Sequence, residues 1–232
     1  MPDKSVPACL KLLRQVAFSC RFVAQAATLA FITALASVPA AAWAESDPGV
    51  VLVFGDSLSA AYRMDEEQGW VALLQRRVDT NGLDWQVQNA SVSGETTSGG
   101  LARLPAVLDS TQPDIVILEL GGNDGLRGLP VPTIRANLQQ MIELSQQAGA
   151  RVMLVGIQIP PNYGPRYTQP FYDQYQELAD QYDTTLIPFL LDGIADQPEL
   201  MQDDGIHPRA EAQGMIVDIV WPVLLPMLEP EG

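Results

Sequence analysis

The chain has 232 residues, 47% of them hydrophobic, which is enough for one domain with a sizeable core. Its formal net charge is −15, and the part after residue 44 holds nine arginines, no lysine and 27 acidic residues. This balance argues against nucleic acid and against anionic membrane surfaces as partners.

Residues 1–44 have the layout of a secretory signal peptide. Four basic residues and one acidic residue precede an apolar run over 22–38, and a small-residue A-x-A site ends at Ala44. The apolar run is close to the length that spans a membrane, so an uncleaved anchor is the alternative. Cleavage after Ala44 predicts a mature domain over 45–232 in the periplasm or outside the cell.

The cysteines and the histidine limit the chemistry of the mature domain. Cys9 and Cys20 are the only cysteines, and both lie in the predicted signal peptide, so we expect no disulfide and a fold held by its core. The domain has a single histidine, His207, and its carboxylates are scattered along the chain. This composition makes no metal-ligand cluster, so we expect no metal.

The stretch VVLVFGDSLS, residues 50–59, predicts a buried strand that ends in a sharp turn. Five apolar residues, rich in β-branched side chains, run into Gly55, where the backbone can turn freely. Ser57 then follows the carboxyl end of the strand, where open α/β sheets place their ligands. A serine here could equally be the N-cap of the next helix, and this stretch alone does not separate the two interpretations.

The rest of the chain alternates between helices and strands. Apolar periodicity and Gly, Pro and Asn breaks predict helices at about 66–78, 99–108, 133–148, 170–182 and 209–228, and strands at about 85–90, 114–120, 151–159 and 184–187. The connections are too long for hairpins, so we predict a doubly wound α/β domain with a mostly parallel sheet and helices on both faces. Parallel strands end at one rim, which would bring together the loops that hold Ser57, Gly94 and Asn123.

A second group of reactive side chains lies near the C-terminus, in the segment DDGIHP. His207 is the one candidate base for a Ser57 nucleophile, because no other histidine exists. Asp204 lies three residues earlier, a spacing that can put its carboxylate against the imidazole Nδ1–H and stabilise the imidazolium. Asp203 is the other acid nearby, and we expect it to point elsewhere. An isolated loop histidine, the alternative, requires neither the neighbouring Asp nor the GDS turn.

A serine that attacks a carbonyl group also needs hydrogen-bond donors for the oxyanion. Gly94 allows close approach of its N–H, the Asn123 side-chain amide can donate, and the Ser57 N–H would be a third donor. Taken singly, Gly94 and Asn123 are ordinary turn and cap residues. The order Ser, Asp, His also occurs in α/β-hydrolases, but their G-x-S-x-G elbow needs Gly where this chain has Ser59.

Four blocks of this sequence resemble the SGNH hydrolases, also called the GDSL family. The blocks are GDSLS with Ser57, SVSGET with Gly94, GGND with Asn123, and DDGIHP with Asp204 and His207. The resemblance covers about residues 50–228 and is closer still to the secreted thioesterase, lysophospholipase and arylesterase branch. It implies a three-layer α/β/α sandwich around a five-stranded parallel sheet. It also implies Ser57 as nucleophile, His207 as base and acid, Asp204 as its orienting partner, and an oxyanion hole made by Ser57, Gly94 and Asn123.

The function implied by this resemblance is hydrolysis of acyl esters and thioesters, lysophospholipids included, through an acyl-enzyme on Ser57 and without a cofactor. The implied location is the periplasm. We expect a monomer whose only partner is its substrate, with no nucleic acid and no stable membrane insertion of the mature chain. Two alternatives stay open: a carbohydrate O-acyl esterase on the same fold, and a non-enzymatic binder whose GDSLS turn cradles a phosphate. The loops after Asn123 and Pro160, rich in Leu, Pro and Tyr, favour an acyl chain over a sugar.

Overall fold

The sheet has five parallel strands in the order β2-β1-β3-β4-β5, in a computed structural model that describes residues 47–229. The predicted signal peptide, 1–44, lies outside the described residues. The strands are β1 (Gly49–Gly55), β2 (Trp85–Asn89), β3 (Ile115–Glu119), β4 (Arg151–Val155) and β5 (Thr185–Ile187). The chain goes outward from β1 to β2 and then returns to β3 on the other side. The order therefore reverses between β1 and β3, where sheets of this kind open a crevice for ligands.

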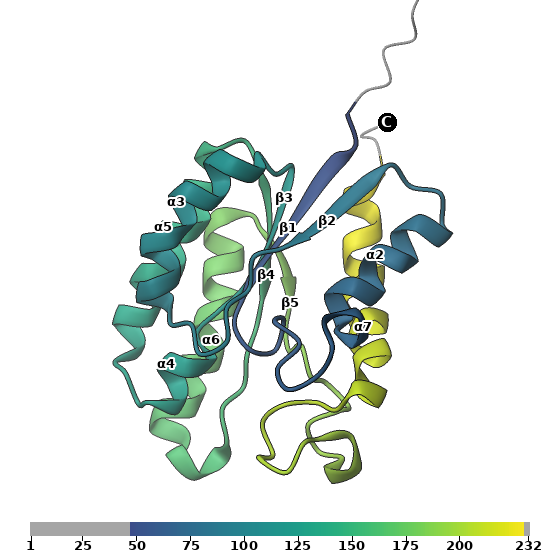
Figure 1. The fold of residues 1–232 in the computed structure, drawn as a ribbon. Helices are drawn as coiled ribbons and strands as arrows, with labels where there is room; N and C mark the ends of the chain where they lie inside the picture. Colours follow the sequence, from purple (N-terminus) through teal and green to yellow (C-terminus); the bar gives the residue numbers. More distant parts are fainter. Residues whose placement is uncertain (1–46, 230–232) are drawn as a thin grey trace, which may run out of the picture. The chain divides into compact units, whose positions relative to one another are not determined.

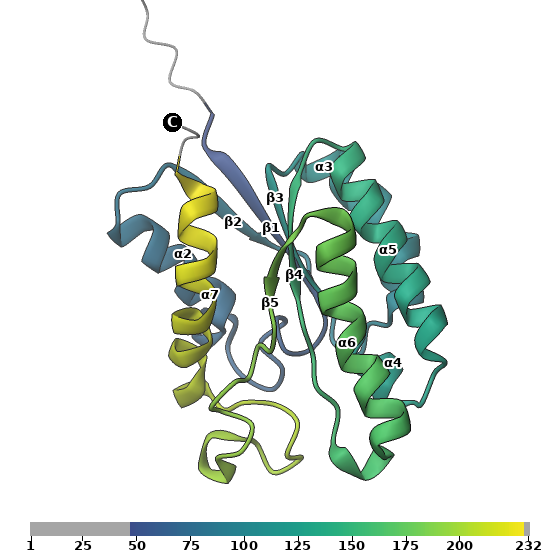
Figure 2. The same ribbon diagram turned by 180° about the vertical axis from the view of Figure 1, so that it is seen from behind.

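Helices cover both faces of this sheet (Figures 1 and 2). One layer holds α3 (Thr97–Thr111), α5 (Val131–Gln147), α6 (Pro165–Tyr182) and the short α4 (Gly122–Leu126). The other layer holds α2 (Trp70–Thr80) and α7 (Gln213–Leu228). Short 3₁₀ helices lie at Glu66–Gln68, Pro161–Tyr163, Pro198–Leu200 and Ala210–Ala212. The arrangement confirms the three-layer α/β/α sandwich with a five-stranded parallel sheet.

Strand β1 shows how the sequence supports both layers. Val51 and Val53 pack in the core under α2 and α7, whereas Leu52 and Phe54 pack in the core under α3 and α5. All four side chains are fully buried. A strand covered on both faces needs an unbroken apolar run, which is what the sequence has.

Helix α7 lies within a long apolar segment of the described chain. The stretch Ala210–Leu228, with a hydropathy of 1.3, is long and apolar enough to cross a membrane by length and composition alone. Its side chains Ile216, Val220 and Leu224 are fully buried in the core that α7 shares with α2 and the sheet. We therefore interpret it as a core helix.

Several predicted boundaries differ from the structure, and one helix was not predicted. The helices predicted from residues 66 and 209 begin as α-helices at Trp70 and Gln213, each shortly after a 3₁₀ helix. The strand predicted over 151–159 ends at Val155, because the chain leaves the sheet there for a loop. Helix α6 begins at Pro165 rather than at Pro170, since a proline at the first helical position needs no backbone N–H. Helix α4 was not predicted, because its sequence GNDGL contains two glycines and has low helix propensity.

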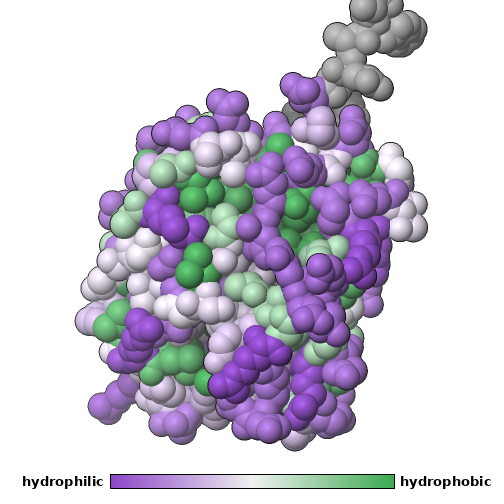
Figure 3. Space-filling view, in the orientation of Figure 1, coloured by the Kyte–Doolittle hydropathy of each residue, from purple (hydrophilic) through white to green (hydrophobic). Residues whose placement is uncertain are grey.

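Polar side chains cover much of the face shown in Figure 3, and hydrophobic surface is seen there as separate patches. Among residues 47–229, the exposed large hydrophobic side chains are Val92, Tyr163, Ile206 and Met215. The first three lie in loops that follow β2, β4 and β5. These loops surround the carboxyl ends of the strands, which form the rim where the sequence predicts the candidate site.

Candidate active site

Ser57 lies in a tight turn directly after β1. The Asp56 carbonyl accepts the N–H groups of Ser59 and Ala60 at 3.3 and 3.0 Å, and the Asp56 Oδ1 accepts the Leu58 N–H at 3.0 Å. Gly55 is required at the strand end because a Cβ there would lie 2.5 Å from Glu119 Oε2. The turn is thus closed by backbone and side chain together, and it holds Ser57 at the rim.

The structure brings Ser57, His207 and Asp204 into one hydrogen-bonded chain, although Ser57 and His207 are 150 residues apart. The Ser57 Oγ lies 2.8 Å from His207 Nε2, and His207 Nδ1 lies 2.9 Å from Asp204 Oδ2. With its proton on Nδ1, the imidazole donates to Asp204 and leaves Nε2 free to accept from the Ser57 hydroxyl. The side chain of His207 is 14% exposed, so the imidazole is largely shielded from solvent.

Asp204 is held in its orientation by more than the imidazole. Its Oδ1 accepts the backbone N–H groups of Ile206 and His207, both at 3.0 Å. Partial burial works against ionisation, but these N–H groups and the imidazole outweigh it and lower the pKa of Asp204 to about 2. Asp204 is therefore an anion at any pH near neutral. Asp203 points to Arg209, 2.9 Å away, and its side chain is 98% exposed.

The candidate oxyanion donors lie in three segments, namely the turn after β1, the loop after β2 and helix α4. Asn123, in α4, lines the same cavity as Ser57, and its Nδ2 donates to Asp56 Oδ2 at 2.9 Å. Gly94 is exposed and has a φ of +80°, a left-handed conformation that favours glycine. It lies in the loop that follows β2, and this loop is tied to the serine turn because the Val92 N–H donates to the Gly55 carbonyl at 3.0 Å. Gly94 is not among the residues that line the cavity.

Two buried acids beneath Ser57 were not identified from the sequence. Burial raises the pKa of Asp56 to about 6, an effect that the Leu58 N–H and the Asn123 amide partly offset. Glu119, at the end of β3, accepts the Asp56 N–H at 3.2 Å and the Ser59 hydroxyl at 2.8 Å, both on Oε2. Complete burial, followed by the nearby Asp56 charge, raises the pKa of Glu119 well above its usual range. The available signal was Glu119 itself, an acid within the apolar stretch that follows Asp114 in DIVILEL.

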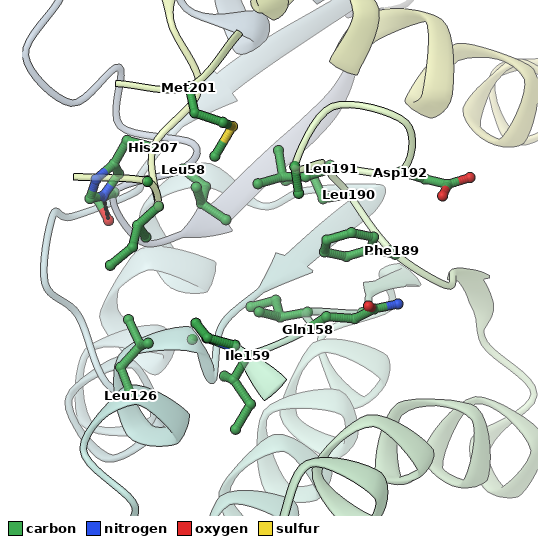
Figure 4. Close-up of a pocket in the computed structure, with 18 of the residues that line it drawn as sticks. Leu58, Leu126, Gln158, Ile159, Phe189, Leu190, Leu191, Asp192, Met201 and His207 are labelled. Atoms are coloured by element: carbon green, nitrogen blue, oxygen red, sulfur yellow. Dashed lines mark hydrogen bonds between the residues drawn. The ribbon is translucent and has the colours of Figure 1, made fainter. Parts of the chain in front are cut away.

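A cavity of about 690 Å³ extends from this chain of residues along the rim. Figure 4 shows His207 at one end and Phe189, Gln158 and Asp192 at the other. Most of the side chains between them are apolar, contributed by Leu58, Leu126, Ile157, Ile159, Leu190, Leu191 and Met201. A hydrophobic chain attached to a group at Ser57 would find an apolar surface there.

The GDSL-like Lipase/Acylhydrolase family model matches residues 53–214, which include all of the residues just described. The chain belongs to this family. Esterase TesA from Pseudomonas aeruginosa is 51% identical over 178 residues, which cover 77% of this chain and 89% of TesA. The crystal structure of TesA covers 77% of this chain and 99% of its own, at 50% identity and a TM-score of 0.75.

Two further relatives carry related names. An arylesterase from Vibrio mimicus is 49% identical over 170 residues, 73% of this chain and 85% of the arylesterase. Thioesterase 1/protease 1/lysophospholipase L1 from Escherichia coli is 43% identical over 186 residues, 78% of this chain and 86% of that protein. With the family match and the fold, these relatives show that the chain is an ester hydrolase. Among residues 47–229 no group of three or more His, Cys, Asp and Glu side chains is placed to hold a metal ion.

Proposed function

We propose that this esterase hydrolyses acyl esters and thioesters through a covalent acyl-enzyme on Ser57. The observation that carries the proposal is the pair of contacts from His207, at 2.8 Å to Ser57 Oγ and at 2.9 Å to Asp204 Oδ2. A neutral hydroxyl is a weak nucleophile, and an adjacent base oriented by a carboxylate is what activates it.

In the first half of the reaction, Ser57 Oγ attacks the acyl carbon and its proton moves to His207 Nε2. The imidazolium formed is stabilised by Asp204, whose lowered pKa of about 2 keeps it ionised. The negative charge on the carbonyl oxygen is met by the N–H groups of Ser57 and Gly94 and by the Asn123 amide. The bond to the leaving oxygen or sulfur then breaks, and the leaving group takes the proton from His207.

In the second half, water replaces the leaving group. His207 takes a proton from this water as the water oxygen attacks the acyl carbon of the Ser57 ester. The second tetrahedral intermediate uses the same donors for its oxyanion. It collapses to release the carboxylic acid, and the proton returns from His207 to Ser57 Oγ. In this scheme the only reactants besides the chain are the ester or thioester substrate and one water molecule.

The apolar cavity supports an acyl chain rather than a sugar as the group that occupies the site. Phe189 is the one phenylalanine, tyrosine or tryptophan among its lining residues, so the cavity has no pair of aromatic platforms for a sugar ring. Its volume of about 690 Å³ is that of a site for a medium-sized ligand. We therefore propose acyl esters, thioesters and lysophospholipids as substrates, the last two also on the basis of the name of the Escherichia coli relative.

The proposed location is the periplasm or the cell exterior, and it depends on the sequence of residues 1–44 alone. A basic start, an apolar run and the A-x-A site ending at Ala44 are the features of a cleaved signal peptide. The mature hydrolase domain would then comprise residues 45–232.

The proposal is tested with a panel of p-nitrophenyl esters, from acetyl to palmitoyl, and an acyl-CoA thioester. Ser57→Ala should reduce kcat on the order of 10⁶-fold, since loss of the nucleophile removes the acyl-enzyme route. Ser110→Ala, an exposed serine on α3, is the matched control and should keep normal turnover. Turnover by Ser57→Ala at the rate of the control would refute the mechanism.

A further inference from the structure

A buried contact joins two of the segments that carry the proposed oxyanion donors. Asp124 directly follows Asn123 in α4, and Thr97, the first residue of α3, lies three positions after Gly94. The Asp124 Oδ2 accepts the Thr97 backbone N–H at 2.9 Å, and Oδ1 accepts the Thr97 hydroxyl at 2.7 Å. Asp124 is 1% exposed and Thr97 is fully buried.

We propose that Asp124 and Thr97 are a positioning pair that sets the separation between the Gly94 N–H and the Asn123 amide. The proposal rests on the oxyanion role of those two donors given under the proposed function. Neither Asp124 nor Thr97 lines the cavity, so the pair acts through the donors and not by touching the substrate.

The Gly94 loop is held by hydrogen bonds on either side of the glycine and at the glycine itself, where the Gly94 carbonyl accepts from Arg127 at 3.4 Å. Before it, the Val92 N–H donates to the Gly55 carbonyl and ties the loop to the serine turn. After it, Thr97 is tied to α4 through Asp124. Gly94 itself has an exposed, left-handed backbone, and a Cβ there would meet nothing within 4 Å. Its position therefore depends on hydrogen bonds, among them the tie from Thr97 to Asp124.

The α4 segment depends on side-chain ties in the same way. It has only five residues, two of them glycine, so its own helical preference is small. Consecutive helical residues point about 100° apart, which lets Asn123 and Asp124 reach different neighbours. Asn123 donates to Asp56 at 2.9 Å beside the serine, and Asp124 accepts from Thr97. Together the two side chains orient α4 between the serine turn and α3.

The chemistry of this contact favours a positioning role over a role in stabilising the packing of α3 against α4. Within residues 47–229, Asp124 forms no salt bridge with an Arg or His side chain. Burying an acid without a cation costs folding free energy, and apolar packing can join two helices at a lower cost in free energy. The bidentate contact also fixes the relative orientation of α3 and α4, since hydrogen bonds determine which atoms face each other. Asn137 of α5 donates to the Thr97 hydroxyl at 3.0 Å, which fixes that hydroxyl as well.

The test compares Thr97→Val with Thr97→Ser and with Thr111→Val. Valine keeps the shape and the backbone N–H of Thr97 but removes the hydroxyl, whereas serine keeps it. Thr111, at the other end of α3, donates its hydroxyl to the Val107 carbonyl at 2.8 Å and is the matched control. Rates are expressed per active site, titrated with a fluorophosphonate, so that loss of folded enzyme does not count as loss of kcat.

Thr97→Val should lower kcat on the order of 10-fold with little change in KM, because small misplacements of catalytic donors act on the transition state. Thr97→Ser should restore most of kcat, and Thr111→Val should leave it unchanged. In an Asn123→Ala background, Thr97→Val should lower kcat by a smaller factor, because one of the donors that the pair positions is already absent. Asp124→Asn should reproduce the kcat loss, and it decides the matter if Thr97→Val does not fold.

The outcomes separate this proposal from the oxyanion role on which it rests. If Asn123→Ala lowers kcat while Thr97→Val and Asp124→Asn do not, the positioning pair is refuted and the oxyanion role stands. If Asn123→Ala leaves kcat unchanged, the oxyanion role of Asn123 fails, and with it the proposal that the pair sets the distance between Asn123 and Gly94. A rise in KM alone in Thr97→Val would also overturn the proposal.

Discussion

Replacing Asn123 by alanine removes its hydrogen bond to Asp56 and, in the proposed mechanism, a second one to the oxyanion. The Asn123 amide has two N–H bonds, and the structure uses one of them to donate to Asp56 Oδ2 at 2.9 Å. In the proposed mechanism the second donates to the oxyanion. Loss of one oxyanion donor costs about 10²–10³-fold in kcat, or about 2.7–4 kcal/mol. KM should change little, because that bond is strongest in the transition state.

The same substitution should also weaken the fold. Asp56 is 2% exposed, and without Asn123 its Oδ2 has no partner, while Oδ1 keeps the Leu58 N–H. A buried polar group left without its partner costs about 1–3 kcal/mol in the free energy of unfolding. The pKa of Asp56, already raised to about 6 by burial, should rise further because the Asn123 bond lowers it.

The assay combines steady-state kinetics on an aryl ester with unfolding in urea. Asn81→Ala is the control, because Asn81 caps α2 away from the site and its amide donates to the Arg77 carbonyl at 2.7 Å. It should lower stability slightly and leave kcat unchanged. A rise in KM with normal kcat in Asn123→Ala would make Asn123 a substrate-binding residue. An unchanged kcat and KM would refute the reasoning altogether.

Three further predictions concern other parts of the chain. Asp204→Asn should keep the fold but favour the wrong His207 tautomer, lowering kcat by as much as roughly 10⁴-fold; normal kcat would remove Asp204 from the mechanism. The raised pKa of Glu119 means that the folded state holds its proton more tightly than the unfolded state, so stability falls as pH rises from the unfolded value toward the folded one. Glu119→Gln lacks this titrating group, so its free energy of unfolding minus that of the parent chain should be larger at pH 8 than at pH 4. A difference that does not change with pH would contradict this. Intact mass of the periplasmic protein should give Glu45 as the first residue, whereas recovery of the full chain in membranes would indicate an anchor.

The parts of the fold that could be predicted are those whose signal is local. The apolar runs of β1 and β3 are visible without their neighbours, because a strand buried on both faces needs no polar residue. The parallel direction of the strands was predicted from the long connections between them. Helix α4 could not be predicted, since GNDGL has little helical preference and is held by partners distant in sequence.

The candidate site likewise has residues that the sequence identifies and residues that only the folded structure reveals. Ser57, Asp204 and His207 stand out by residue type and by position after a strand or beside one another. Glu119 and Asp124 act on residues 63 and 27 positions away, contacts that only the folded chain creates. Spacing along the sequence therefore indicates which groups could react, but not which buried acids hold them in place.

The central claim, a covalent acyl-enzyme route through Ser57, is tested most directly by mass spectrometry after treatment with a fluorophosphonate. The account predicts one phosphonyl group per chain, located on the peptide that contains Ser57, with labelling in step with the loss of esterase activity. His207→Asn should label far more slowly and Ser57→Ala not at all, because the first lacks the base and the second the nucleophile. Complete inactivation with the label on another residue, or undiminished labelling of Ser57→Ala, would contradict the account.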